Sequence, residues 1–157
     1  MNMTLQNAGA LALAPDEGER LFWLGEPAIL KVTGAETGGH YAVAEVISTP
    51  EGFVPLHVHD NEDEAFLIMD GEVEFTVGGK TLPAGPGAFV FGPRGVPHSY
   101  RVKSASARIM MIFSPAGFEN FIRETSVPLD KAHEAGEPDM EGLMQAAARY
   151  GARILAE

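Results

Sequence analysis

Three histidines and one glutamate are the residues of this sequence best suited to chemistry. His57 and His59 are separated by one residue, Glu64 follows soon after them, and His98 heads a later apolar segment. In an extended strand, side chains two residues apart point to the same face, so both imidazoles converge on one point. The polar stretch after His59 can turn the chain so that Glu64 joins them. Because the chain has no cysteine, nitrogen and oxygen ligands are predicted for one divalent transition metal ion.

Ligand type alone does not identify the metal. Imidazoles and a carboxylate suit Fe, Mn, Ni, Co, Cu and Zn. Glu62 and Asp63 are alternative carboxylates, but Glu64 is favoured because it begins an apolar run, while its neighbours are expected to face solvent. Glu64 could also be catalytic, as a base toward a bound acidic substrate. His40 and His133 are expected to be solvated.

The elements that must position these residues are predicted to be short strands. Between residues 22 and 113, apolar, β-branched and aromatic runs alternate with Gly and Pro, which favours an all-β sandwich or barrel without helices. Asp70-Gly71 and Gly78-Gly79 each predict a hairpin turn. The Gly/Pro turn before His98 predicts another hairpin. Strands are expected at 28–33, 40–48, 55–59, 64–70, 72–77, 80–83, 88–91, 98–102 and 107–113.

A substrate pocket beside the metal would be lined by residues that share its face of the strands. Strand alternation places five candidates there, with core packing as the alternative for each: Phe66, Ile68, Tyr100, Met111 and Phe113. Phe22 and Trp23 could cover the pocket or an open end of the core.

The segments outside the strand region differ in character. Phe118, Phe121 and Ile122 recur at helical spacing, and residues 140–155 predict an amphipathic C-terminal helix. We expect an N-terminal arm at 1–20, one strand domain at 21–125, and a loop with a C-terminal helix at 126–157.

Composition limits the partners. The formal charge is -11, which disfavours nucleic acid and anionic membrane surfaces, and no apolar run is long enough to span a bilayer. Without a secretory signal pattern, the cytoplasm is the expected location.

Two segments around the proposed ligands resemble the two sequence motifs of the cupin superfamily. The first resembles the motif with H-x-H and a following glutamate, and the second resembles the P-x-G motif that ends in histidine. The matching residues are Gly52, His57, His59, Glu64 and Gly71 for the first, and Gly87, Pro93, Gly95 and His98 for the second. The spacing between Gly52 and His57 is one residue short, and Val102 stands where the family often has Asn.

The resemblance implies a single cupin (jelly-roll) β-barrel with short C-terminal helices and a metal held by the four named ligands. Within the family, the chain resembles bacterial single-domain proteins related to quercetin 2,3-dioxygenase. This implies a metal-dependent dioxygenase acting on a small enolic or aromatic, flavonol-like substrate. The alternatives are an O2-independent isomerase or cyclase, and a non-catalytic small-ligand-binding protein. We expect a homodimer, because such domains expose edge strands.

Overall fold

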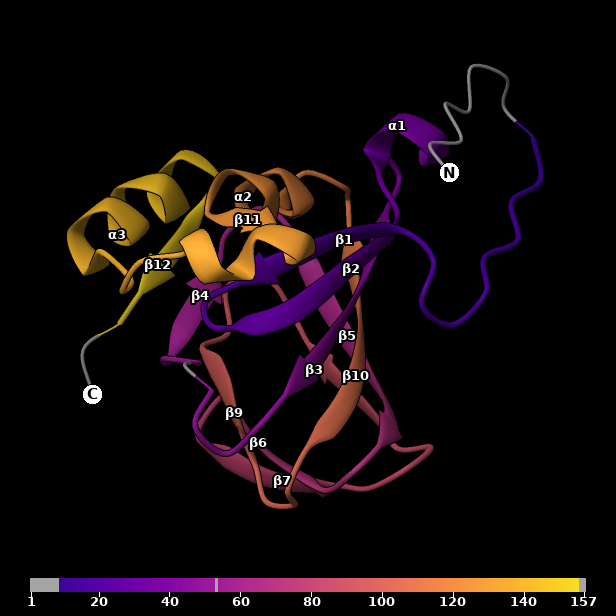
Figure 1. The fold of residues 1–157 in the computed structure, drawn as a ribbon. Helices are drawn as coiled ribbons and strands as arrows, with labels where there is room; N and C mark the ends of the chain where they lie inside the picture. The colour runs from indigo at the N-terminus through magenta and orange to yellow at the C-terminus, as the bar shows by residue number, and fades with distance from the viewer. Residues whose placement is uncertain (1–8, 53, 156–157) are drawn as a thin grey trace.

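The computed structural model describes residues 9–52 and 54–155, which form two antiparallel β-sheets packed face to face (Figure 1). The larger sheet has the strand order β11-β1-β2-β3-β10-β5-β8, and the smaller sheet has the order β12-β4-β9-β6-β7. In chain order the strands are β1 (Glu19–Trp23), β2 (Glu26–Val32), β3 (Ala42–Ser48), β4 (His57–His59), β5 (Asp63–Asp70), β6 (Val73–Val77), β7 (Lys80–Ala84), β8 (Phe89–Gly92), β9 (His98–Val102), β10 (Ala107–Ser114), β11 (Ser126–Pro128) and β12 (Ala152–Ile154).

The predicted all-β jelly roll is confirmed, with one refinement: in the described residues the two sheets do not join into a continuously hydrogen-bonded barrel. The core lies between the sheets and follows strand alternation. On β10, for example, Ile109, Met111 and Phe113 are buried while Arg108 and Met110 are partly exposed. This alternation turns one face of each strand to the core.

Two of the predicted hairpins are wrong. Gly78-Gly79 does join two paired strands, β6 and β7, and both glycines have positive φ. Asp70-Gly71, however, connects β5 in the larger sheet to β6 in the smaller one, and the turn before His98 likewise connects β8 to β9. Sequence alternation shows which face of a strand is buried but not which strand lies beside it, so a crossing between sheets was mistaken for a hairpin.

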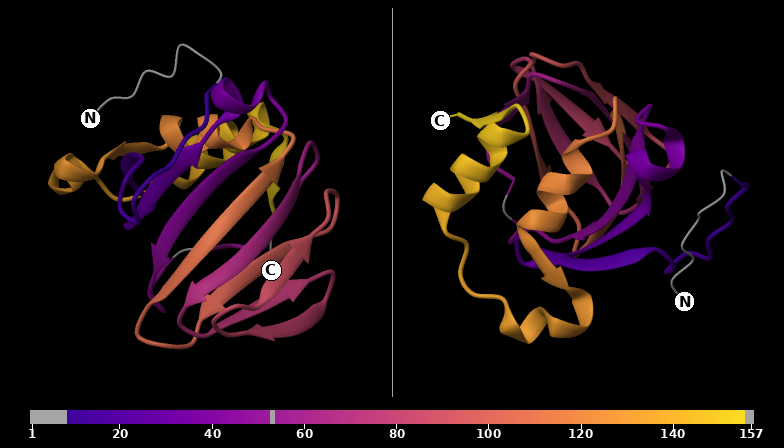
Figure 2. Two further views of the ribbon diagram at one scale, coloured as in Figure 1. Left: turned by 90° about the vertical axis from the view of Figure 1, so that its right-hand side faces the viewer. Right: turned by 90° about the horizontal axis from the view of Figure 1, so that it is seen from above.

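Helices cover one end of the two sheets, as the view from above in Figure 2 shows. They are α1 (Gly34–Thr37), α2 (Phe118–Glu124), the 3-10 helix η1 (Leu129–Glu134) and α3 (Met140–Arg149). The short α1 falls where no helix was predicted, and a Thr33–Glu36 capping box begins it. None of the helices in the described ranges is long and apolar enough to cross a membrane.

Both ends of the described chain differ from expectation. The predicted helix at 140–155 is wrong in its last turn: α3 ends at Arg149, Gly151 takes φ 74°, and the chain continues as β12. Three short strands, β1, β11 and β12, were not predicted. In the expected N-terminal arm, residues 1–8 lie outside the described residues, and β1 already begins at Glu19. The division into arm, strand domain and tail remains a prediction.

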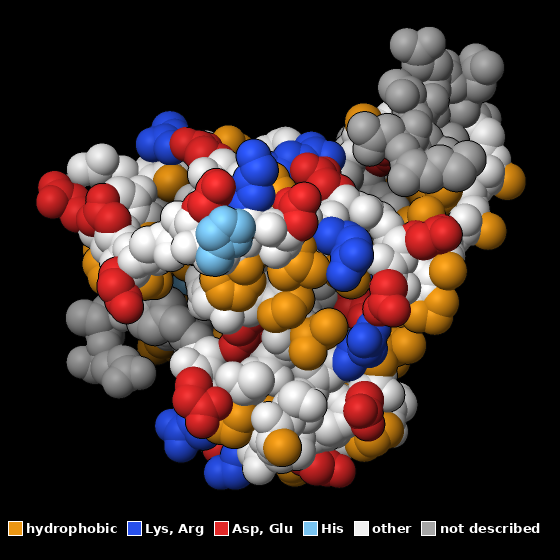
Figure 3. Space-filling model, in the orientation of Figure 1, with side chains coloured by type: hydrophobic (Ala, Val, Ile, Leu, Met, Phe, Trp, Pro, Cys, Tyr) orange, Lys and Arg blue, Asp and Glu red, His pale blue; other side chains and the backbone are white. Residues whose placement is uncertain are grey.

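Charged side chains are intermixed on the face shown in Figure 3, with acidic and basic groups side by side. Several of them pair, for example Arg123 with Glu19 at 2.8 Å between Nε and Oε2. On this face, therefore, the net negative charge is not gathered into a patch of one sign.

Candidate metal centre

The two sheets bring the four predicted ligand residues together. His57 and His59 lie on β4, His98 is the first residue of the neighbouring β9, and Glu64 projects from β5 of the opposite sheet. One potential ligand atom from each of the four residues lies within 4.8 Å of the other three. His57 and His98 are register partners across β4 and β9. The cluster therefore joins the sheets, with three imidazoles from one and a carboxylate from the other.

Backbone carbonyls orient two of the imidazoles. His57 Nδ1 lies 2.8 Å from the Pro55 carbonyl oxygen, and His98 Nδ1 lies 3.3 Å from that of Val96. Because a carbonyl oxygen can only accept, each Nδ1 carries a proton, and this leaves Nε2 of each ring as the atom that can bind a metal ion. An outer hydrogen bond of this kind is the usual support of a metal-bound histidine.

Glu62 supports the third imidazole, which corrects the expectation that this carboxylate faces solvent. Its side chain is 3% exposed, and Oε1 lies 3.2 Å from His59 Nδ1. Asp63, the other acidic neighbour of Glu64, does face outward, and it pairs there with Arg94. The bend between β4 and β5 turns the Glu62 side chain inward beside His59. Strand alternation does not apply to a bend, so the sequence pattern could not predict this contact.

The spacing of the inner atoms fits a bound cation. Glu64 Oε2 lies 2.9 Å from His98 Nε2 and 3.1 Å from His59 Nε2. His59 Nε2 is buried without a hydrogen-bond partner among the described residues. Two ligands at right angles, each about 2.1 Å from a metal ion, would lie about 3 Å apart. Lone pairs facing one another at this distance require a positive charge between them, which either a proton on an imidazole or a divalent metal ion would supply.

The pKa values of the cluster residues also favour a positive charge among their inner atoms. Burial lowers the pKa of His57 to about 4, so that its ring is neutral, as a metal ligand must be. Burial opposes the charged form of His59 as well, but its contacts with Glu62 and Glu64 outweigh burial and raise its pKa to about 9. Burial also acts against the Glu64 carboxylate, but His59 and His98 keep its pKa well below the usual range. The centre thus holds an anion that attracts a cation.

An apolar cavity of about 90 Å³ adjoins the cluster. His57 and Glu64 form part of its wall, whereas His59 and His98 are almost completely buried behind them. The rest of the wall is formed by Trp23, Leu24, Glu26, Val46, Val54, Pro55, Phe66, Tyr100, Met111, Phe118, Phe121, Leu143, Ala147, Ala152 and Ile154. We call this space the metal-side cavity.

Three of the five predicted pocket residues line the metal-side cavity, namely Phe66, Tyr100 and Met111. Ile68 and Phe113 do not; both are fully buried in the core. Ile68 lies toward the far end of β5, away from Glu64. Phe113 is the register partner of Glu64, but its ring packs 5.1 Å from that of Phe118. Strand alternation correctly predicted that both side chains point to the inner face of the sheet, but it did not predict whether they reach the cavity.

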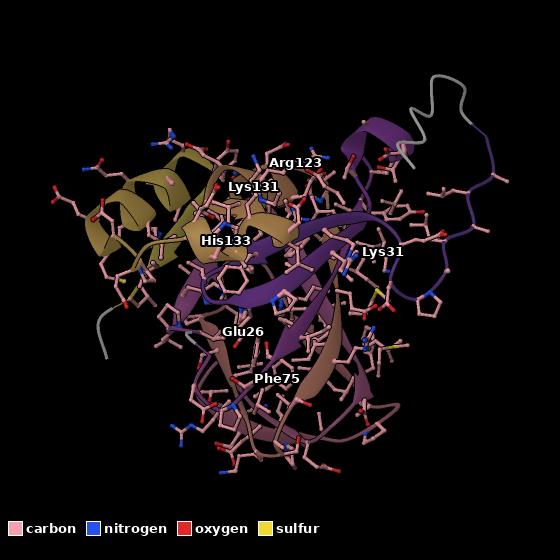
Figure 4. All side chains as sticks on the ribbon, in the orientation of Figure 1. Glu26, Lys31, Phe75, Arg123, Lys131 and His133 are labelled. Carbon is pink, nitrogen blue, oxygen red and sulfur yellow. The ribbon has the colours of Figure 1, made fainter. Side chains whose placement is uncertain are left out.

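Sequence reasoning missed most of the covering wall. The spacing of Phe118 and Phe121 predicts a helix but not where its side chains point. In the structure both residues of α2 line the cavity, and the ring centroids of Phe118 and His59 are 4.5 Å apart. Nothing in the sequence singled out Glu26. In contrast, His133 lies outside the sheets on η1, as expected, and Figure 4 shows it there together with Lys131.

Comparison with known proteins agrees with the sequence motifs and the fold. A family model described as a cupin domain matches residues 44–113, which contain all four cluster residues. Residues 44–113 thus form a cupin domain. Quercetin 2,3-dioxygenase from Bacillus subtilis (strain 168) is 32% identical over 98 residues, which are 62% of this chain and 29% of that protein. The match therefore covers less than a third of the length of that relative.

Solved structures share the fold at lower sequence identity. A predicted oxalate decarboxylase from Thermotoga maritima aligns with a TM-score of 0.60 and 19% identity, covering 67% of this chain and 99% of that one. Ectoine synthase from P. lautus aligns with a TM-score of 0.59 and 20% identity, covering 76% and 90%. Because these names differ in activity, the shared cupin fold does not determine the reaction.

Proposed function

We propose that this cupin is a metal-dependent dioxygenase acting on a small enolic substrate. The observation that carries the proposal is the metal-side cavity, into whose apolar wall only one edge of the His/Glu cluster opens, at His57 and Glu64. The partial identity with quercetin 2,3-dioxygenase supports O2 as the second substrate. A divalent transition metal held by the four ligands would supply a Lewis acid for a substrate oxygen and, in a redox-active form, a route to O2.

The chain's own groups have separate roles in this proposal. Glu64 faces the cavity as an anion, so its carboxylate accepts a hydrogen bond from the enol hydroxyl and orients it. Phe66, Met111 and Phe118 exclude water from the reacting atoms. His59, fixed by Glu62, and His98, fixed by Val96, hold the ligand geometry from behind.

The size of the cavity favours a substrate smaller than a flavonol. At about 90 Å³ it is smaller than the roughly 150 Å³ cavity that holds one benzene molecule. A three-ring flavonol would enter only after the covering elements moved. Small 1,3-diketones, which enolise readily, therefore match the cavity better.

O2 consumption tests the proposal. Protein loaded with Fe, Mn, Ni or Co is given a small 1,3-diketone or a flavonol in an oxygen electrode. We expect O2 uptake with the diketone in at least one metal form, and its loss in His57→Ala. Glu74→Gln, a change outside the metal-side cavity, is the matched control. Uptake at the protein-free rate for every combination would refute the proposal.

A second candidate is an O2-independent isomerase or cyclase. The observation that favours it is that the cavity wall contains two further groups that can exchange protons with a substrate, namely Glu26 and Tyr100. Proton transfer between such groups can rearrange a substrate without an oxidant. The same reactions run under strict anaerobiosis separate the candidates, because product formation without O2 supports only the second.

A further inference from the structure

Glu26 is an ionisable side chain in a wall that is otherwise mainly apolar. It begins β2 of the larger sheet, whereas the three cluster histidines lie on β4 and β9 of the smaller sheet, and Figure 4 labels it above Phe75. Glu26 is one of the residues that line the metal-side cavity. No Lys, Arg or His of the described chain lies within ion-pair distance of it. An unpaired acid in such a place costs desolvation energy, and accordingly burial raises the pKa of Glu26.

The hydrogen bonds of Glu26 leave part of its carboxylate free. Ser48 Oγ donates to Oε2 at 2.5 Å, and the Thr49 N–H donates to Oε1 at 3.3 Å. Ser48 Oγ also lies 3.1 Å from the Tyr100 hydroxyl, which is itself at the cavity wall. A carboxylate has about four acceptor positions, so two remain after these bonds.

Gly52 keeps space for this carboxylate. A Cβ at this position would overlap Glu26 Oε1, so any other residue there would push the carboxylate away. The absence of a side chain at Gly52 therefore leaves room for the Glu26 carboxylate in its observed position.

Glu26 also separates two different spaces. On its other side lies a polar recess, which we call the outer recess, formed by residues that include Ser48, Thr49, Gly52, Glu74, Thr76, Ser99 and Arg101. Glu26 and Tyr100 line both the outer recess and the metal-side cavity. The wall of the metal-side cavity therefore has two polar parts, His57 and Glu64 in one and Glu26 with Tyr100 in the other. They lie at different levels of the larger sheet, because Ser48, which holds Glu26, pairs with Ala107 on β10, whereas Glu64 pairs with Phe113.

We propose that Glu26 is a specificity-determining residue that binds a hydroxyl group at the end of the ligand remote from the metal centre. The ligand class is a small compound with one oxygen function for the metal, an apolar middle and a distal hydroxyl that donates to the free side of the Glu26 carboxylate. This inference rests on the proposed function, since the near end of the same ligand is held at His57 and Glu64.

A binding series tests the subsite without turnover. Zinc-loaded protein is titrated with straight-chain carboxylic acids of three to six carbons and with the same acids carrying a terminal hydroxyl. The single tryptophan, Trp23, lines the cavity, so its fluorescence reports binding. At one chain length we expect the hydroxy acid to bind at least about tenfold more tightly than its parent, as for a hydrogen bond to a charged group.

Two variants assign this preference to the carboxylate. Glu26→Gln, which keeps the shape but removes the charge, should reduce the preference to about threefold. Gly52→Ala, which leaves Glu26 in the chain but displaces its carboxylate, should reduce it as well. Glu74→Gln, an acid of the outer recess alone, should leave the preference unchanged. Circular dichroism confirms that each variant is folded.

The outcomes separate this inference from the proposed function. Equal binding of acid and hydroxy acid at every length, or an unchanged preference in Glu26→Gln, overturns the subsite while leaving the metal centre intact. Absence of binding by the whole series, in protein shown to contain zinc, overturns the subsite too. Zinc binding is measured separately, and its absence would refute the metal centre and with it the proposed function, before the subsite is tested.

Discussion

At the scale of single residues, the candidate centre depends on an acid that lies behind one of its candidate ligands. Glu62 touches no predicted cation position, yet it fixes the ring of His59 through Nδ1. Without this contact the buried imidazole could turn or change tautomer, and its Nε2 lone pair would no longer face Glu64.

Replacement of Glu62 should therefore weaken metal binding. We expect Glu62→Gln to reduce zinc affinity by about 10–100-fold in competition titrations with a chromophoric chelator. Asp63→Asn is the matched control, because Asp63 pairs with Arg94 at the surface and should leave the affinity unchanged. Equal losses in the two variants would show that local charge, and not the support of His59, governs the affinity.

Glu26 should also make the free energy of unfolding depend on pH. Its pKa is raised above 4.5 by burial, so the folded protein binds this proton more tightly than the unfolded chain does. Stability is then lost as the pH rises from about 4.5 through the folded-state pKa. Glu26→Gln removes this loss, and the free energy of unfolding of the variant relative to wild type should be higher at pH 7 than at pH 4. Urea denaturation of metal-free protein at both pH values measures it, and a pH-independent difference would contradict the assignment.

At the scale of elements, β4 matters most, because it carries two imidazoles on three residues. It lies between β9 and β12, and β12 pairs Ala152 with His59 and Ile154 with His57. Two further backbone hydrogen bonds, Asp60 N–H to Gly151 O and Leu155 N–H to Leu56 O, extend this contact.

Removal of β12 should therefore disturb the centre from a distance. We expect deletion from residue 152 onward to lower zinc affinity and to expose Trp23, seen as a red shift of its fluorescence. Arg153→Ala, which removes only an exposed ion pair with Asp60, is the control and should change little. Unchanged zinc affinity after the deletion would show that β9 alone suffices to place β4.

The elements also show what sequence can predict. The side-by-side imidazoles of His57 and His59 and the buried face of β10 follow from strand alternation, which is local. Partnership between strands is not local, so the crossings at Asp70-Gly71 and before His98 were mistaken for hairpins. The roles of Glu26 and the β12 pairing were missed for the same reason, since each depends on a segment that the chain brings close only after folding. Glu62 is only three residues from His59, and its contact depends on the bend between β4 and β5, which strand alternation does not describe. The homodimer and the cytoplasmic location remain predictions.

At the scale of the whole molecule, the cluster connects two sheets that share no continuous hydrogen-bonded ladder in the described residues. Glu64 comes from the larger sheet and the three histidines from the smaller one. A metal ion bound by all four would cross-link the sandwich at its helix-covered end.

Metal should accordingly stabilise the folded protein. At free zinc about 100-fold above the dissociation constant, we expect a gain of about 2.7 kcal/mol in the free energy of unfolding, measured by urea denaturation with and without chelator. His98→Ala should abolish most of this gain, whereas His133→Ala, on the exposed η1, should retain it. A gain that persists in His98→Ala would place the stabilising ion elsewhere.

The pairing of β12 with β4 also bears on the order in which the molecule is assembled. During synthesis β4 emerges early, whereas its partner strand β12 follows most of the remaining chain. Contacts between segments so distant in sequence form late, because closing the loop between them costs chain entropy. Until β12 pairs with β4, the two imidazoles of β4 would lie on a strand held by β9 alone, so the complete four-residue centre would form late in folding.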